Sequence, residues 1–304
     1  MIDTILNRIS NEYPLTVKKN ESLSGYTTMR TGGNAEYIVF PESAEGIVAL
    51  CKELDDNSVR YIVIGKGSNL LFPDEGFNGV VVCTEKIDFI KVNGKEISAG
   101  CGASLIKLSR AACDASLGGL EFAYGIPGTV GGAVYMNAGA YDGEVSMIVK
   151  SVSCYDTVEK KLLVLDNESC DFSYRNSIFE KSGNRYIITD AVFNLEHKDK
   201  NEISAQMNDY MTRRRDKQPL EYPSAGSAFK RAPGYFTAKL IDESGLKGYT
   251  VGGAQVSEKH AGFIINRGNA TSDDVRSLIS HIQKTVLEKN GVELESEIRI
   301  ITNN

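Results

Sequence analysis

The chain has 304 residues, which is enough for two or three domains with cores of their own. Its composition is that of an ordinary globular protein, and its formal net charge of −6 argues against a nucleic-acid-binding surface over the whole molecule. No stretch approaches the roughly 20 apolar residues that span a bilayer, and the N-terminus lacks the features of a signal peptide. We therefore expect no nucleic-acid partner and no membrane partner.

Cysteine and histidine usage points to a reducing compartment without a metal site. None of the six cysteines forms a C-x-x-C pair, and most lie inside apolar runs, so we expect reduced core thiols and a cytoplasmic protein. His197, His260 and His281 lie far apart and lack neighbouring ligands at useful spacing. We expect no metal.

Hydrophobic periodicity predicts alternating helices and strands along the chain. The first part contains, in order, an amphipathic helix at 1–11, a strand at 37–40, a helix capped by Ser43, a buried strand at 61–64, β segments at 80–83, 87–92 and 95–99, and a helix with Leu105, Leu108 and Ala112 inside. The second part contains strands at 149–155, 161–165 and 186–195, a linker at 196–202, a helix with Ile203 and Met207, a helix at 273–290 capped by Thr271 or Ser272 and stopped by Gly291, and a closing strand at 294–301.

Residues 125–143 combine six glycines with apolar side chains. A flexible linker is polar and rich in serine, so this stretch is not a linker. Glycine allows backbone to approach another group closely or to adopt positive φ. The stretch therefore has two readings of equal weight, which are backbone wrapped around a large flat or anionic ligand and a tight turn into a glycine-packed element.

The segment from Gly65 to Leu71 follows a predicted buried strand and resembles a dinucleotide-binding turn only in part. Leu70 replaces the third glycine of G-x-G-x-x-G, and Pro73 stands where the helix would run, so a Rossmann fold is excluded. No phosphate loop of the G-x-x-x-x-G-K-[ST] type is present either. The Gly/Ser/Asn turn still offers backbone amides to a pyrophosphate.

Seven motifs occur in an order that closely resembles the UDP-N-acetylenolpyruvoylglucosamine reductase family, over nearly the whole chain. They are Thr28 to Gly33, Gly65 to Leu71, Gly125 to Ala133, Asn137 to Tyr141, Tyr174 to Phe179, Ala225 to Lys230 and Glu297 to Arg299. The family has a branch with an additional tyrosine-bearing loop over the substrate. Residues 182–210 are too short and plain for that loop, so the chain resembles the branch without it.

The resemblance implies an α+β fold: a p-cresol-methylhydroxylase-like FAD-binding domain of two α+β subdomains, followed by an α+β substrate domain. We expect subdomain 1 at 1–57, with the C-terminal strand near 298–304 returning to it, subdomain 2 at 58–200 and the substrate domain at 201–304. The implied reaction is reduction of UDP-N-acetylglucosamine enolpyruvate to UDP-N-acetylmuramate, a cytoplasmic step of peptidoglycan synthesis, with FAD as cofactor and NADPH as hydride donor. The partners are then these small molecules, and we expect a monomer.

The resemblance also assigns residues, motif by motif. Arg175 and Glu297 match the polar pair that stabilises the enolate, and Ser227 matches the proton donor. Glu297 would need a raised pKa in that role. Arg214, Lys217, Gln218 and His260 are weaker candidates for the UDP-sugar; the basic run around Arg214 also suits a helix C-terminus. The cofactor-binding candidates are Arg30, Thr31, Gly32, Gly65, Lys66, Gly67, Ser68, Asn69, Leu70, Gly125, Ile126, Pro127, Gly128, Gly131, Gly132, Ala133, Asn137, Gly139 and Ala140.

Two other functions compete with the reductase. One is an oxidase or dehydrogenase on the same flavin fold, whose members often tether FAD through histidine. No histidine precedes His197, so histidyl tethering in the flavin region is excluded and we expect non-covalent FAD. The other is a UDP-sugar sensor without catalysis, which replacement of Ser227 would separate from an enzyme.

Overall fold

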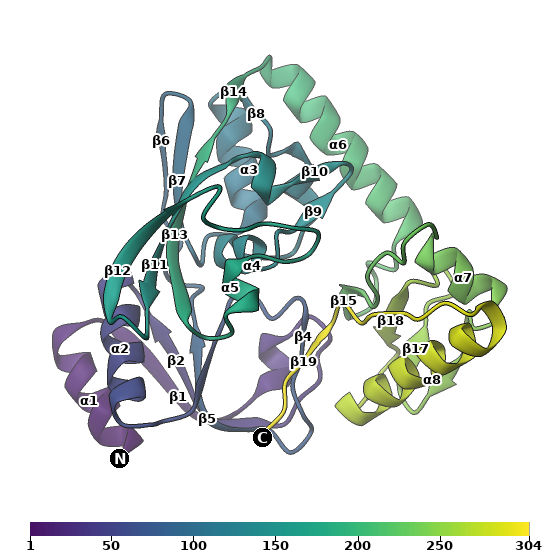
Figure 1. Ribbon diagram of the computed structural model, residues 1–304, viewed down its shortest axis with the longest axis horizontal. Helices are drawn as coiled ribbons and strands as arrows, with labels where there is room; N and C mark the ends of the chain where they lie inside the picture. The colour runs from purple at the N-terminus through teal and green to yellow at the C-terminus, as the bar shows by residue number, and fades with distance from the viewer. Residues whose placement is uncertain (304) are drawn as a thin grey trace. The chain divides into compact units, whose positions relative to one another are not determined.

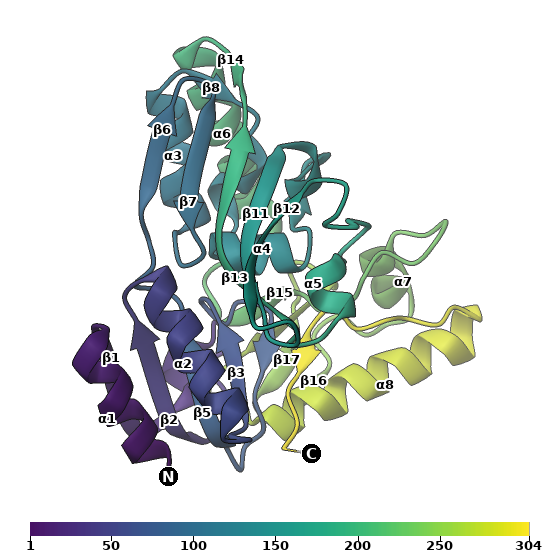
Figure 2. The same cartoon turned by 60° about the vertical axis from the view of Figure 1, so that its left-hand side comes forward.

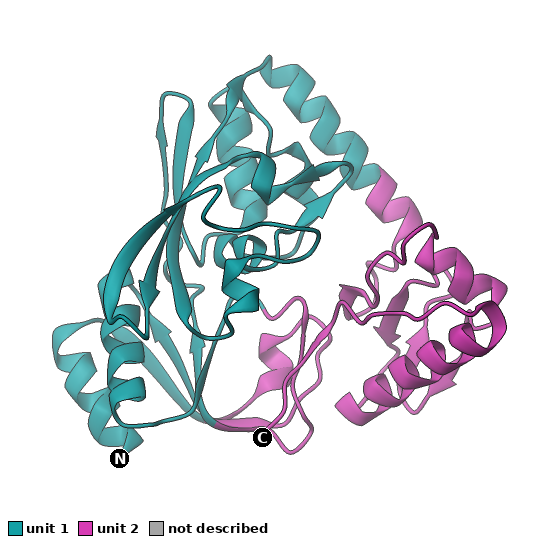
Figure 3. Ribbon diagram, in the orientation of Figure 1, with its two compact units in different colours: residues 1–19, 37–66, 79–212 teal, residues 20–36, 67–78, 213–304 magenta. Residues whose placement is uncertain are grey.

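The computed structural model describes residues 1–303, which divide into two compact units (Figure 3). Unit 1 contains Met1–Lys19, Tyr37–Lys66 and Gly79–Thr212, and unit 2 contains Asn20–Glu36, Gly67–Asn78 and the chain from Arg213 onward. The chain thus passes between the units several times, because the segments 20–36 and 67–78 belong to the same unit as the C-terminal part of the chain. The division into 1–57, 58–200 and 201–304 stays a prediction.

The first sheet, of four strands, has the order β1-β2-β5-β3, in which β3 and β5 run parallel (Figure 1; β3 is labelled in Figure 2). Ser43 caps α2 as predicted, because its hydroxyl accepts a hydrogen bond from Gly46 N at 3.0 Å. One face of α2 buries Ile47, Leu50, Cys51 and Leu54. The elements are α1 (Ile2–Glu12), β1 (Leu15–Ser22), a 3₁₀ turn at Leu23–Tyr26, β2 (Asn34–Pro41), α2 (Ala44–Asp56), β3 (Tyr61–Ile64), β4 (Leu70–Leu71) and β5 (Phe77–Cys83).

The second sheet is antiparallel, with the order β12-β11-β13-β7-β6 (Figure 2). Its elements are β6 (Ile90–Asn93), β7 (Glu96–Gly100), β11 (Val149–Asp156), β12 (Lys161–Asp166) and β13 (Tyr186–Asn194). The connecting elements are α3 (Leu105–Asp114), β8 (Leu117–Gly118), a 3₁₀ turn at Glu121–Gly125, α4 (Val130–Tyr135), β9 (Gly139–Ala140), β10 (Gly143–Glu144), a 3₁₀ turn at Val145–Met147 and α5 (Ile178–Lys181).

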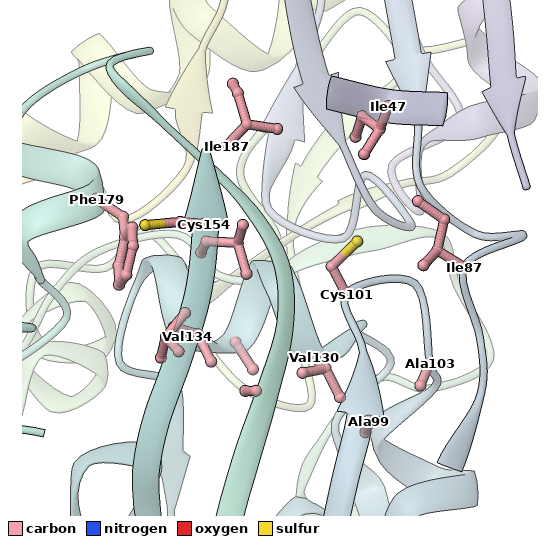
Figure 4. Close-up of a cluster of buried hydrophobic side chains, with 14 of the residues drawn as sticks. Ile47, Ile87, Ala99, Cys101, Ala103, Val130, Val134, Cys154, Phe179 and Ile187 are labelled. Atoms are coloured by element: carbon pink, nitrogen blue, oxygen red, sulfur yellow. The ribbon is translucent and has the colours of Figure 1, made fainter. Parts of the chain in front are cut away.

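One apolar core runs through unit 1. Val130 and Val134 of α4 lie near Cys101, Cys154 and Phe179 in that core (Figure 4). All six cysteines are buried, and no disulfide forms in the part of the chain that the structure describes. Burial raises the pKa of the Cys101 and Cys154 thiols to about 12, so these thiols are protonated at neutral pH.

The expected linker at 196–202 is wrong. Glu196–His197 form β14, which pairs antiparallel with β8, and α6 (Lys200–Lys217) begins three residues later. The polar side chains that suggested a linker have charged partners instead of being only solvated. Lys95 Nζ contacts Glu196 at 2.5 Å, and Lys198 Nζ contacts Glu121 at 3.1 Å.

Unit 2 contains a four-stranded sheet of order β15-β18-β17-β16 together with α7 and α8. The elements are β15 (Ser224–Ser227), α7 (Thr237–Glu243), β16 (Thr250–Val251), β17 (Ala254–Val256), β18 (Phe263–Asn266), α8 (Ser272–Asn290) and β19 (Arg299–Ile300). The helix α8 forms as predicted, with a capping box at Thr271 and a left-handed Gly291 at its end. Its buried stripe consists of Val275, Leu278, Ile279, Ile282 and Val286.

The closing strand is shorter than expected. Only Arg299–Ile300 form β19. This strand pairs in parallel with β4 at Leu70–Leu71, which lies outside the range 1–57 expected for subdomain 1. Glu295 and Glu297 instead make single backbone bonds to Lys230 and Ala228. Among residues 1–303, no helix is long and apolar enough to cross a bilayer.

Candidate functional site

Arg175 lies in unit 1 at the tip of a tight turn. Ser173 and Asn176 exchange both backbone hydrogen bonds, at 3.0 and 3.1 Å, so Tyr174 and Arg175 form the tip. Arg175 has a φ of 53°, which is unfavourable for a residue with a side chain. Its Nη2 donates to the carbonyl of Gly139 at 2.9 Å, and its guanidinium carbon lies 5.1 Å from the centre of the Tyr174 ring. The glycine-rich stretch therefore orients this side chain.

The glycine-rich stretch contains the short helix α4, and a side chain at three of its six glycines, Gly131, Gly139 and Gly143, would meet neighbouring atoms at 3.0 Å or less. A Cβ on Gly131 would lie 3.0 Å from Cys101 Cβ, and one on Gly143 would lie 2.6 Å from the Phe122 ring. Gly132 differs, because a Cβ there would meet only Thr129 Oγ1, at 3.6 Å. The packing reading therefore applies at these crowded glycines, and the reading of the stretch as backbone against a ligand stays a prediction.

The segment from Gly65 to Leu71, which is predicted to bind FAD and is named the flavin loop, begins in unit 1 and packs there against the glycine-rich stretch. A Cβ on Gly65 would lie 2.1 Å from Thr129 Oγ1, so only glycine fits there. Thr129 is buried and caps α4, accepting from Gly132 N at 3.4 Å. Asn137 is fully buried, and its side chain donates to Ser173 O at 3.0 Å, which links the stretch to the turn that carries Arg175.

The flavin loop continues in unit 2, where it packs against the segment that contains Arg30, Thr31 and Gly32. A Cβ on Gly67 would lie 2.2 Å from the carbonyl oxygen of Tyr26, and the Gly67 carbonyl accepts from Thr28 N at 3.4 Å. The Oγ1 atoms of Thr28 and Thr31 are buried and have no hydrogen-bond partner. A buried hydroxyl without a partner is unfavourable, so these two atoms indicate a site for a polar ligand.

Ser227 and Glu297 come from neighbouring segments of unit 2. Glu297 N donates to Ala228 O at 2.9 Å, and Lys230 N donates to Glu295 O at 2.9 Å. The register of β15 shifts between Ser224 and Ser227, where Gly226 has a φ of 80°. Ser227 is exposed and Glu297 is half-buried. The structure thus places both predicted proton-handling residues next to one backbone hydrogen bond.

Of the predicted substrate residues, Arg214 and Lys217 lie in the last turn of α6, Gln218 follows that helix, and His260 lies between β17 and β18, all in unit 2. Burial is the main cause that lowers the pKa of His260, and the charges of Lys247 and Lys217 contribute. Lys259 Nζ donates to Arg215 O at 2.6 Å and ties the two segments together. Gln218 Oε1 is buried without a hydrogen-bond partner, so it too indicates a polar ligand. Arg214, half-buried, lies one helical turn before Gln218.

The residues within each unit, taken separately, fit a bound FAD on three observations. The hydroxyls of Thr28 and Thr31 can bond to phosphate or ribose oxygens. Gly132 leaves an exposed surface of α4 without a side chain. The turn from Gly65 to Asn69 offers backbone amides as hydrogen-bond donors and contains two closely packed glycines, Gly65 and Gly67.

Several roles could not be found from the sequence. Thr28 has no sequence signal of its own within its motif, and only the structure shows that its hydroxyl is buried without a hydrogen-bond partner. The Gly139 carbonyl that holds Arg175 is a backbone atom and leaves no sequence signal. The stacking of Tyr141 on Tyr210 of α6, with ring centres 4.3 Å apart, also had no signal beyond the residue types.

Two family models match the chain. Residues 35–161 match the FAD binding domain, and residues 218–301 match the C-terminal domain of UDP-N-acetylenolpyruvoylglucosamine reductase. Curated proteins named UDP-N-acetylenolpyruvoylglucosamine reductase are similar over nearly their whole length. The one from Caldicellulosiruptor bescii is 49% identical over 93% of this chain and 90% of the relative, and the one from Listeria welshimeri is 47% identical over 97% and 99%.

A solved structure gives the same result. The crystal structure of the UDP-N-acetylenolpyruvylglucosamine reductase from Thermus caldophilus matches with a TM-score of 0.80 and 33% identity, covering 95% of this chain and all of that one. These matches confirm the predicted α+β fold class, the FAD cofactor and the assignment as a reductase. The chain is a member of the UDP-N-acetylenolpyruvoylglucosamine reductase family.

Proposed function

We propose that this chain reduces the enolpyruvyl double bond of UDP-N-acetylglucosamine enolpyruvate to give UDP-N-acetylmuramate, with NADPH as the hydride donor. The observation that carries the proposal is the presence of Arg175, Ser227 and Glu297 within motifs of this family, in a chain whose relatives are named for this substrate. When bound, FAD supplies the hydride chemistry, taking a hydride from NADPH and delivering it to the double bond. The residues of the chain then handle charge and protons on the substrate.

Arg175 stabilises the negative charge that hydride addition creates. Hydride delivered to the terminal carbon of the enolpyruvyl group leaves charge on the adjacent carbon and on its carboxylate. A guanidinium makes a charge-assisted hydrogen bond to that carboxylate. The bond from Arg175 to the Gly139 carbonyl, at 2.9 Å, supports this role because it restricts the side chain before substrate binds.

Glu297 and Ser227 have different roles, which are a hydrogen bond to the enolate and transfer of a proton to carbon. In its protonated form Glu297 donates a hydrogen bond to the developing enolate, as an acid kept neutral in an active site does. Ser227 delivers a proton to the adjacent carbon, which only a strongly basic carbanion can take from a hydroxyl. The backbone bond from Glu297 to Ala228, the neighbour of Ser227, supports a joint role.

The experiment separates the two half-reactions in the absence of oxygen. Purified protein with bound flavin is bleached with NADPH, and UDP-N-acetylglucosamine enolpyruvate is then added while the flavin spectrum is followed. We expect rapid recovery of the oxidised spectrum and formation of UDP-N-acetylmuramate. Failure of the substrate to restore the spectrum overturns the proposal. Consumption of oxygen with a simple alcohol would favour an oxidase, and binding of the UDP-sugar without turnover would favour a sensor.

Ser227→Ala tests the proton donor, and Ser224→Ala in the same strand β15 is the matched control. We expect Ser227→Ala to retain FAD and its reduction by NADPH, while substrate-dependent reoxidation slows by at least about 100-fold, the lower range for a general acid. Ser224→Ala should behave as the unmodified protein. Unchanged turnover in Ser227→Ala removes the serine from the mechanism.

We also propose that the enzyme is a cytoplasmic monomer. The six buried thiols, none of them in a disulfide within residues 1–303, support a reducing compartment. Light scattering at micromolar concentration should give the mass of one chain, about 33.2 kDa before cofactor. A mass of twice that value contradicts the monomer.

A further inference from the structure

Asn69 lies at a junction between the flavin loop and the segment that carries Glu297. Its side-chain Nδ2 donates to the carbonyl oxygen of Glu297 at 2.8 Å. Its own carbonyl accepts from Arg299 N at 3.0 Å, where β19 begins to pair with β4. All of these residues belong to unit 2. A residue predicted from its motif to bind cofactor therefore also holds the backbone beside a predicted catalytic acid.

The peptide groups on both sides of the Glu297 Cα are fixed. Its N–H donates to Ala228 O at 2.9 Å, and its carbonyl accepts from Asn69. Because the backbone is held at both ends, the direction of the Cα–Cβ bond is fixed as well. The carboxyl of Glu297 then starts from a defined position before substrate arrives, which reduces the reorganisation needed during the reaction.

We propose that Asn69 is a positioning residue for Glu297, acting through the backbone of that residue; this rests on the proposed role of Glu297. The amide is the group the position requires, because a carbonyl acceptor needs an N–H donor. Aspartate has nearly the same shape, but its carboxylate offers no donor and places charge against the Glu297 carbonyl. Asn69→Asp thus removes the function while preserving side-chain volume.

The effect should fall on one half-reaction. NADPH reduces bound flavin without using Glu297, so we expect the rate of flavin reduction, per bound FAD, to stay within about threefold in Asn69→Ala and Asn69→Asp. Displacement of a catalytic group by about 1 Å lowers rates by about 100-fold. We therefore expect substrate-dependent reoxidation to slow by about 10- to 100-fold in both variants.

Asn303 provides a matched control. Its Nδ2 donates to Gly76 O at 2.8 Å. Like the bond from Asn69 to Glu297, this bond joins an asparagine amide to a backbone carbonyl and links the C-terminal segment to residues 67–78. Asn303 lies six residues after Glu297 in sequence. Asn303→Ala should leave both half-reactions unchanged. Equal slowing in Asn303→Ala and Asn69→Ala means that loosening this junction, and not positioning of Glu297, explains the loss.

A double-mutant cycle decides whether Asn69 acts through Glu297. Glu297→Gln alone should slow reoxidation, and Asn69→Asp should add little, less than about threefold, once Glu297 is replaced. If the two effects multiply, or if both variants at Asn69 lose FAD and slow the two half-reactions equally, Asn69 serves the cofactor only and the inference is wrong. If Glu297→Gln leaves reoxidation unchanged, the proposed role of Glu297 fails and this inference fails with it.

Discussion

The contact between Gly65 and Thr129 offers a quantitative test of why the flavin loop needs glycine. A Cβ on residue 65 would lie 2.1 Å from Oγ1, 3.0 Å from Cγ2 and 3.1 Å from Cβ of Thr129. Thr129 is 1% exposed, and its hydroxyl caps α4, so it has little room to move. Overpacking of a buried site costs about 1–3 kcal/mol, and loss of the cap adds about 1 kcal/mol. We expect Gly65→Ala to lower the free energy of unfolding by about 2–4 kcal/mol.

Thr129→Gly should rescue this loss. Alone, it removes a buried side chain and weakens the cap, which costs about 1–2 kcal/mol. It also removes the three atoms that lie nearest to the new Cβ at residue 65. The double variant should therefore be about as stable as Thr129→Gly alone, which gives a coupling free energy of about 2–4 kcal/mol.

Urea unfolding of the cofactor-free protein, followed by circular dichroism, measures the four free energies of the cycle. Gly132→Ala is the control, because its Cβ would meet only Thr129 Oγ1 at 3.6 Å and the residue lies within α4. Alanine in a helix stabilises by about 0.5–1 kcal/mol relative to glycine, so this variant should be no less stable. It should nevertheless bind FAD more weakly if the cofactor lies on that surface. Additivity of Gly65→Ala and Thr129→Gly within about 0.5 kcal/mol would refute the steric argument.

Three further predictions concern contacts within single units. A hydrogen bond from Arg185 is the main cause that lowers the pKa of Asp156, so this carboxylate stabilises the fold above its unfolded pKa of about 4 and loses its effect as the pH falls through the lower folded value. Asp156→Asn should cost about 1–3 kcal/mol at pH 7, with the deficit shrinking in urea titrations below pH 4; a deficit independent of pH contradicts this. Tyr141 has a φ of 51° and stacks on Tyr210, so Tyr141→Ala should be about 1 kcal/mol less stable than Tyr141→Gly in thermal unfolding, and equal stability argues against strain. Asp74 accepts from the first backbone N–H groups of α8, at 2.7 and 2.9 Å, so Asp74→Ala should cost about 1–2 kcal/mol by urea unfolding, and a neutral effect contradicts this capping role.

Elements with complete local signals could be predicted from the sequence. The helix α8 has a cap at Thr271, an apolar stripe and a terminal Gly291, and each signal is local. The helix α4 could not be predicted, because Gly131 and Gly132 weaken helix propensity and its stability comes from burial of Val130 and Val134 in the core. Tertiary packing thus overrides the local preference.

Strand and linker errors have a similar cause. Apolar and polar residues do alternate over 294–301, but only Arg299–Ile300 pair with another strand. Strand pairing depends on what the fold places beside a segment, and the segment's own sequence does not determine it. The polar run after β13 was expected to be a linker, yet Glu196 pairs with Lys95, about 100 residues earlier in the chain. A run of charged residues is therefore a poor indication of a linker when residues of opposite charge lie close to it in the fold.

Candidate residues were recognisable by motif, whereas the contacts that orient them were not. Arg175 depends on the Gly139 carbonyl, and Glu297 depends on Asn69, which lies 228 residues away in sequence. Both supporting residues belong to motifs that were predicted to bind FAD. A loss of activity after replacement in these motifs can therefore arise from a displaced catalytic side chain with the cofactor still bound. Rates measured per bound flavin, for each half-reaction separately, distinguish this cause from loss of FAD.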